Sequence, residues 1–188
     1  MRRGAPSSGC QAFDVLHKIM LFLHPAISDD LVRAVVHQKN AIEFSVHGLS
    51  HWQRVERNAL FLAAEEGGDM LVASLFALFH DSRRINDFED PEHGARGGVL
   101  ASEFFATGRL PINEPQMEVL VYACEHHTDE IVHGDTTIQC CWDGDRLDLT
   151  RIGVIPDPMM LNTETAKRIA KVMDYSEIEN FTLGEPQR

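Results

Sequence analysis

MLVASLFALFHD, residues 70–81, is the stretch of sequence that decides the fold of this chain. Asp69 stands directly before it and is a residue type that caps helix N-termini. The apolar part of the run contains one polar side chain, Ser74, and a helix that is apolar on all sides belongs inside a bundle. The run is about half as long as a membrane span. We therefore expect a central helix of a folded domain that ends in His80 and Asp81.

Glycine, proline and helix-capping residues divide the rest of the chain into further helices. No segment alternates between apolar and polar residues with the period that marks a strand. The expected helices run roughly over residues 10–24, 28–38, 50–67, 91–108, 114–127, 136–149 and 163–173. The predicted fold class is all-α, a single-domain helical bundle of about seven or eight helices. The expected domain covers residues 10–175, with a loose N-terminal tail over 1–9 and a C-terminal tail over 176–188.

The chain carries a strong excess of acidic side chains. Its 188 residues include 29 Asp and Glu against 17 Lys and Arg, which gives a formal net charge of −12. Such a surface repels nucleic-acid backbones and anionic membranes, so we expect neither a nucleic-acid polymer nor a membrane as a partner. A small phosphorylated substrate is compatible with this charge, because a bound divalent cation can dominate the local field.

The four cysteines, Cys10, Cys124, Cys140 and Cys141, form no CxxC pair. Buried, reduced thiols are the expected state, with a cysteine metal site as the alternative. We find no convincing targeting segment and expect a cytoplasmic protein. The amphipathic first helix, over residues 10–24, leaves a homodimer open.

Four short motifs carry histidines and carboxylates in a fixed order. They are HWQRV at 51–55, LFHD at 78–81, EHH at 125–127 and WDGDRLD at 142–148. Histidine nitrogens and carboxylate oxygens together suit zinc, manganese, iron, cobalt or nickel. In this order the motifs resemble those of the HD-domain superfamily of metal-dependent phosphohydrolases. The resemblance spans roughly residues 44–150 and implies an HD-type helical domain.

The resemblance implies a metal ion held by His51, His80, Asp81 and Asp145. It also implies that a metal-activated water hydrolyses a phosphate ester or anhydride. A nucleotide or another small phosphorylated metabolite is the expected substrate. The divalent metal ion is left open among Mn, Co, Ni, Zn and Fe; we expect one ion, with two as the alternative.

Further residues near the motifs are candidates for other roles. Those for a second metal or for substrate contact are His126, His127 and His93. Those for phosphate binding or acid–base chemistry are Arg83, Arg84, Asp87 and Asp148. We expect His47 and Arg54 behind the ligands, with Arg54 in an ion pair that braces the bundle. Two-metal members of the family usually have a loop histidine where this chain has Asp90, which counts against a complete two-metal site.

Two other functions compete with phosphate hydrolysis. The second reading is a diiron oxygenase, which the resemblance allows because some HD-domain proteins bind two irons and oxidise C–H bonds; it requires a complete two-metal ligand set. A non-catalytic metal-binding or ligand-sensing module is the third reading. The intact His80–Asp81 doublet and the closing Asp145 count against a non-catalytic module.

Overall fold

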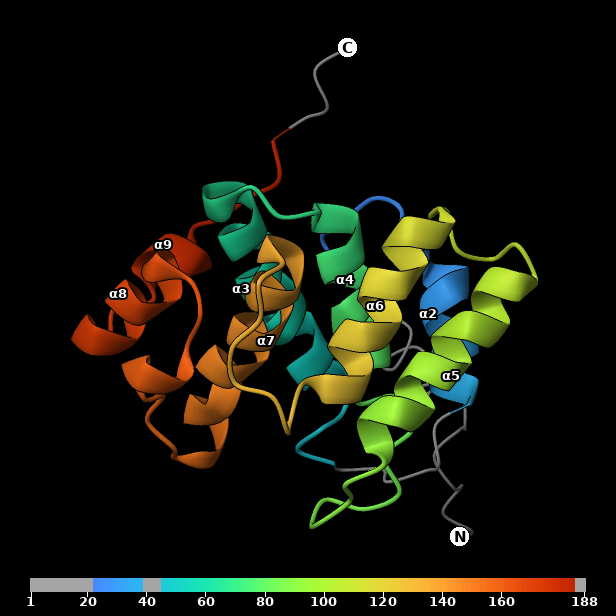
Figure 1. Ribbon diagram of the computed structural model, residues 1–188, viewed down its shortest axis with the longest axis horizontal. Coiled ribbons are helices and arrows are strands. Elements are labelled where there is room, and N and C mark those ends of the chain that lie inside the picture. The colour runs from blue at the N-terminus through green and yellow to red at the C-terminus, as the bar shows by residue number, and fades with distance from the viewer. Residues whose placement is uncertain (1–21, 39–44, 185–188) are drawn as a thin grey trace, which may run out of the picture.

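Helix α4 (Met70–Phe79) lies in the middle of the bundle, as Figure 1 shows. The side chain of Asp69 caps this helix by accepting hydrogen bonds from the backbone N–H groups of Leu71 and Val72. Every side chain from Val72 to Phe79 is buried, as expected for a helix that is apolar on all sides. Other helices therefore pack around α4 on several sides.

The computed structural model describes residues 22–38 and 45–184, and within them it contains eight α-helices, two short 3₁₀ helices and no strand. In chain order the elements are α2 (Asp29–His37), α3 (Leu49–Glu66), α4, α5 (His93–Ala106), α6 (Glu114–His126), α7 (Thr136–Leu147), η1 (Asp148–Ile152), η2 (Pro158–Met160), α8 (Glu164–Val172) and α9 (Ser176–Glu179). The predicted all-α class is confirmed.

Most helix ends agree with the stop and capping residues, and two helix starts differ from the prediction. The backbone of Gly67 has a φ of 83°, a left-handed conformation that glycine adopts without strain, and it ends α3. Helix α3 begins at Leu49 with Gly48 as its N-cap, whereas the sequence predicts a start at residue 50. Helix α5 begins at His93, and Pro91 lies in the turn before it.

Several predictions for the chain termini fall outside the described residues. These are the N-terminal tail, Cys10 and the first helix up to residue 21; residues 22–24 are described and are not helical.

The expected C-terminal tail begins with a further short helix, α9. Ile178 of α9 is buried, and Arg57 of α3 donates a hydrogen bond to the backbone oxygen of Glu179. These contacts attach α9 to the bundle.

Helices α3 and α7 pack closely, which places two of the sequence motifs beside each other (Figure 1). A Cβ atom on Gly144 of α7 would lie 2.8 Å from both the Cβ and the backbone nitrogen of Ala59 in α3. Asn58 also donates a hydrogen bond of 2.9 Å to the backbone oxygen of Gly144. Glycine at this position therefore permits the close approach, and the next residue, Asp145, is held near the first turn of α3.

The three described cysteines are buried free thiols. Burial raises the pKa of Cys140 to about 12, so its thiol stays protonated at neutral pH. No helix in the described part of the chain is both long and apolar enough to cross a membrane.

Candidate metal centre

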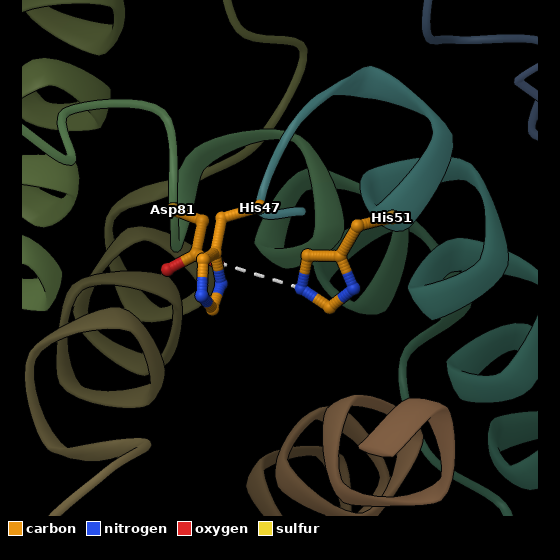
Figure 2. Close-up of side chains that lie close together, drawn as sticks. All are labelled: His47, His51 and Asp81. Carbon is orange, nitrogen blue, oxygen red and sulfur yellow. Dashed lines mark hydrogen bonds and ion pairs between the residues drawn. The ribbon is translucent and has the colours of Figure 1, made fainter. Parts of the chain in front are cut away.

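Four side chains from three helical segments meet inside the bundle, next to the end of α4. His51 lies in the first turn of α3, and Asp145 lies in α7. His80 is the C-cap of α4, and Asp81 follows it in the chain. Figure 2 shows Asp81 beside His47, with the ring of His51 facing them. Chain segments far apart in the sequence thus bring the four predicted ligands together.

The donor atoms of these four side chains lie close to one another. His51 Nε2 is 3.2 Å from His80 Nε2 and 3.3 Å from Asp145 Oδ1. It is also 3.5 Å from Asp81 Oδ2. His80 Nε2 is 3.7 Å from Asp81 Oδ2 and 3.8 Å from Asp145 Oδ1. Ligand atoms on a tetrahedral metal ion with bonds of about 2.1 Å are about 3.4 Å apart. The five separations are close to this value, and His51, His80 and Asp145 form one of the groups that could hold an ion.

The second ring nitrogen of each histidine has an acceptor of its own. His51 Nδ1 is 2.7 Å from Asp148 Oδ2. His80 Nδ1 is 3.1 Å from the backbone oxygens of Phe76 and Ala77. In the neutral ring the proton therefore resides on Nδ1, and Nε2 presents its lone pair to the centre of the cluster. Metal-bound histidines are typically held in this way.

Burial and neighbouring charges shift the pKa values of the cluster in opposite directions. Burial disfavours a charge on His51, but hydrogen bonds to Asp145, Asp148 and Asp81 outweigh it and raise the pKa of His51 to about 10. Burial lowers the pKa of His80 to about 3, although Asp81 and Asp145 act in the opposite direction. Burial also disfavours the charge on Asp81, but His80 and three hydrogen-bonded histidines keep its pKa well below the usual range.

The donor set fits a divalent cation. Two imidazole nitrogens and two carboxylate oxygens suit first-row transition metals, and these buried histidines and aspartates could hold a metal ion. His51 and His80 are fully buried, whereas the Asp145 side chain is 21% exposed. The cluster is therefore reached from solvent on the side of Asp145.

A row of polar contacts supports the ligands from behind. Arg54 Nε donates to Asp148 Oδ1 at 2.7 Å, and Arg54 Nη2 donates to Asp148 Oδ2 at 3.1 Å. Asp148 in turn accepts from His51, so its carboxylate fixes the orientation of that ring. His47 Nδ1 is 2.8 Å from Asp81 Oδ2 and donates to this carboxylate because the carboxylate is ionised. Asp148, a candidate for acid–base chemistry, thus lies behind a ligand.

The other oxygen of Asp81 faces a second group of side chains. Asp81 Oδ1 is 3.1 Å from His93 Nε2 and 3.9 Å from His127 Nε2. The two Nε2 atoms are 3.0 Å apart. Arg84 Nη1 lies in the same place, 3.1 Å from His93 Nε2 and 3.4 Å from Asp81 Oδ1. This group therefore contains a permanent cation.

The remaining candidates lie outside both groups. His126 packs its ring on Tyr122, with the centroids 4.5 Å apart, and approaches Asp129 and Glu130 through Nδ1. Arg83 donates to the backbone oxygen of Gln38. Asp87 accepts from the hydroxyl of Ser45. Asp90 pairs with Arg96 and accepts from the backbone N–H of Ile85, so it holds its loop and does not point at Asp81.

Sequence reasoning missed Arg151 of η1. Its Nη2 is 3.3 Å from His47 Nδ1, and its Nη1 donates to the backbone oxygen of Asp148 at 3.1 Å. The spacing of three residues from Asp148 is the one available signal, since residues three apart are neighbours on a helical turn. That signal does not distinguish Arg151 from an ordinary surface arginine.

The chain is similar in structure to a predicted HD superfamily hydrolase from an uncultured Thermotogales bacterium, known from a crystal structure. The TM-score is 0.60 at 25% sequence identity, and the match covers 75% of this chain and 82% of that chain. No protein-family model matches the chain, and no curated protein does. The likeness therefore rests on structure together with the ordered motifs.

The structural match covers most of the helical domain, and its all-α fold agrees with the helices described above. The buried His/Asp groups could hold a metal ion, which together with the match supports a metal-dependent hydrolase. Fold and motifs together confirm that this chain resembles the HD superfamily.

Proposed function

We propose that this protein is a metal-dependent phosphohydrolase that acts on a phosphate ester or anhydride of a small metabolite, with nucleotides as the first substrate class to test. The observation that carries the proposal is the convergence of donor atoms from His51, His80, Asp81 and Asp145: each histidine Nε2 lies 3.2–3.8 Å from the other and from both carboxylates. When bound there, a divalent cation supplies an activated water and polarises a phosphate oxygen.

The surroundings of the cluster support this reaction. Asp148 and the backbone oxygens of Phe76 and Ala77 keep both Nδ1 protons outside the centre. The ligand nitrogens are therefore already oriented, which reduces the reorganisation that binding requires. The side chains of Asp145 and His47 are 21% and 16% exposed, so we expect a phosphorylated substrate to approach on this side.

The deciding experiment measures phosphate release from nucleoside mono-, di- and triphosphates and from sugar phosphates, with Mn, Co, Ni, Zn or Fe added in turn. Wild-type protein should release phosphate with at least one combination. Asp81→Ala should lose the activity, because it removes a proposed ligand. Asp30→Ala is the matched control, since Asp30 is 91% exposed and pairs with Arg33 on the surface. Equal release by wild type and Asp81→Ala would contradict the proposal.

One observation favours a second candidate, a diiron oxygenase. Asp81 has histidines on both sides, His51 and His80 near one oxygen and His93 and His127 near the other. A carboxylate with this environment can bridge two metal ions. An oxygenase requires two irons per chain and oxygen consumption with a C–H substrate; measurement of both quantities separates it from the hydrolase.

A further inference from the structure

We infer that Arg84 takes the place of a second cation at Asp81 Oδ1, so that the centre holds one metal ion and not two. The inference rests on the proposed function, because it presumes that a metal binds at Oδ2. It concerns the side chain that stands three residues after the His80–Asp81 doublet.

The guanidinium of Arg84 is fixed by contacts on three of its nitrogen atoms. Nη1 donates to Asp81 Oδ1 at 3.4 Å and lies 3.1 Å from His93 Nε2. Nη2 donates to the backbone oxygen of Phe88 at 2.9 Å, and Nε donates to that of Asn86 at 3.3 Å. The residue is 8% exposed. Movement of Arg84 away from Asp81 would therefore break several hydrogen bonds in a nearly buried place.

The histidines of this group lie close to Asp81 Oδ1, and one of them, His93, contacts the arginine. His93 Nδ1 lies within hydrogen-bond distance of the backbone oxygen of Asp90, and His127 Nδ1 is 2.7 Å from that of Cys124. His93 Nε2 lies 3.1 Å from Asp81 Oδ1, 3.0 Å from His127 Nε2 and 3.1 Å from Arg84 Nη1. His93 Nε2 and Asp81 Oδ1, two atoms that a second metal would need as ligands, thus already contact a permanent positive charge.

The loop that carries the acceptors for Arg84 is braced at its far end. Asp90 binds Arg96 through Nη2 at 2.6 Å and accepts from the backbone N–H of Ile85 at 3.0 Å. These contacts close residues 85–90 into a compact loop, and Phe88 and Asn86 lie within it. The carboxylate of Asp90 is thereby directed to Arg96, while the guanidinium of Arg84 is held at Asp81. A divalent ion beside this guanidinium would be repelled by its charge and would have to displace it.

In the described part of the chain, no arginine or lysine forms an ion pair through Asp81 Oδ2. Oδ2 faces His47, His51 and His80. Among the described residues no arginine or lysine forms an ion pair with Asp145, the second carboxylate at this position, whereas Arg84 approaches Asp81 through Oδ1. Arg151 approaches the Oδ2 side only through His47, 3.3 Å from its Nδ1. The two sides of Asp81 therefore differ in whether a guanidinium contacts the carboxylate itself.

The test is the number of Mn²⁺ ions bound per full-length chain, measured by equilibrium dialysis with elemental analysis and by electron paramagnetic resonance. Wild type should bind one ion, with the spectrum of an isolated Mn²⁺. Arg84→Gln removes the charge and should bind two ions with a spin-coupled spectrum. Arg84→Lys retains the charge and should bind one. The double variant Arg84→Gln/His127→Gln should return to one ion, which locates the added ion beside His127.

Each other result overturns the inference. Two coupled ions in wild type would show that Arg84 does not exclude the second metal. One ion in a folded Arg84→Gln variant, with the helical signal retained, would show that the charge is not the cause. Should Arg84→Gln fail to fold, the spectrum of wild type decides between an isolated and a coupled ion. Wild type that binds no Mn²⁺ would overturn the proposed function itself, a failure distinct from a count of two.

Discussion

The two carboxylate oxygens of Asp81 belong to one side chain, yet they face different surroundings. Oδ2 faces His47, His51 and His80, and the last two also contact the carboxylate of Asp145. These carboxylates and Asp148 raise the pKa of His51 to about 10. Oδ1 faces His93, His127 and Arg84, a group that already contains a cation. Clustered histidines alone therefore do not define a metal site, because a neighbouring positive charge can exclude a metal ion from them.

The largest difference between the two sides should appear when one residue of each is removed. Asp145→Ala deletes a proposed ligand on the Oδ2 side. Mutation of a residue that only supports a ligand costs up to about 100-fold in metal affinity, and loss of a ligand should weaken Mn²⁺ binding by more than that. His127→Gln, on the Oδ1 side, should leave the binding of one ion intact. Isothermal titration calorimetry measures both. Comparable losses in the two variants would remove the distinction between the sides.

A smaller loss is expected from the support behind the Oδ2 side. Asp148→Asn keeps all four proposed ligands but removes the carboxylate that accepts from His51 and pairs with Arg54. Changes of this kind typically cost about 10- to 100-fold in metal affinity, and we expect a loss in that range. The matched change Asp143→Asn affects a carboxylate that caps α8 through Thr163. It should lower thermal stability and leave metal affinity unchanged, and a drop in affinity would contradict this.

The pH dependence of metal binding reports the charge of the same side. Burial disfavours a charge on His51 and lowers its pKa. Hydrogen bonds to Asp145, Asp148 and Asp81 outweigh this effect and raise the pKa of His51 to about 10. His80 stays unprotonated down to about 3. A metal ion must therefore displace one proton, that of His51, so affinity should fall about tenfold for each pH unit below this pKa. Calorimetry in buffers of different ionisation enthalpy should find about one proton released per ion. Release of none would mean that His51 is not a ligand.

The smallest effect concerns the packing that holds His127 in place. A Cβ on Gly94 would lie 2.2 Å from the backbone oxygen of Cys124 and 3.0 Å from His127 Nδ1, so Gly94→Ala should destabilise the fold by about 1–3 kcal/mol. At Gly98 the nearest atom, the backbone oxygen of Val121, is 3.4 Å away. Gly98→Ala should be neutral or stabilising, because alanine favours a helix by about 1 kcal/mol over glycine. Thermal unfolding compares the two; equal destabilisation would contradict the account.

The sequence allowed the fold class and most helix boundaries to be predicted, because apolar periodicity and capping residues are local signals. The end of α3 at Gly67 and the capped start of α4 at Asp69 are examples. The start of α3 was predicted less well. It depends on the turn that ends at Gly48, which caps the helix without a side-chain hydrogen bond and so leaves no local sequence signal.

The candidate site divides in the same way. The order of the motifs singled out His51, His80, Asp81 and Asp145, and the structure brings these four together. His126 and His127 are adjacent at the end of α6, and the rotation of the last helical turn determines which of them points inward. The sequence could therefore not predict which of the two faces the cluster. The place of Arg84 depends on the path of the loop over residues 85–90, which long-range contacts determine.

Anomalous X-ray diffraction from crystals of the full-length protein soaked in Mn²⁺ tests the central claim most directly. The account predicts a single strong peak at about 2.0–2.2 Å from His51 Nε2, His80 Nε2, Asp81 Oδ2 and Asp145 Oδ1. A peak elsewhere on the molecule, or none at saturating Mn²⁺, would contradict the assignment of these four residues as the metal centre.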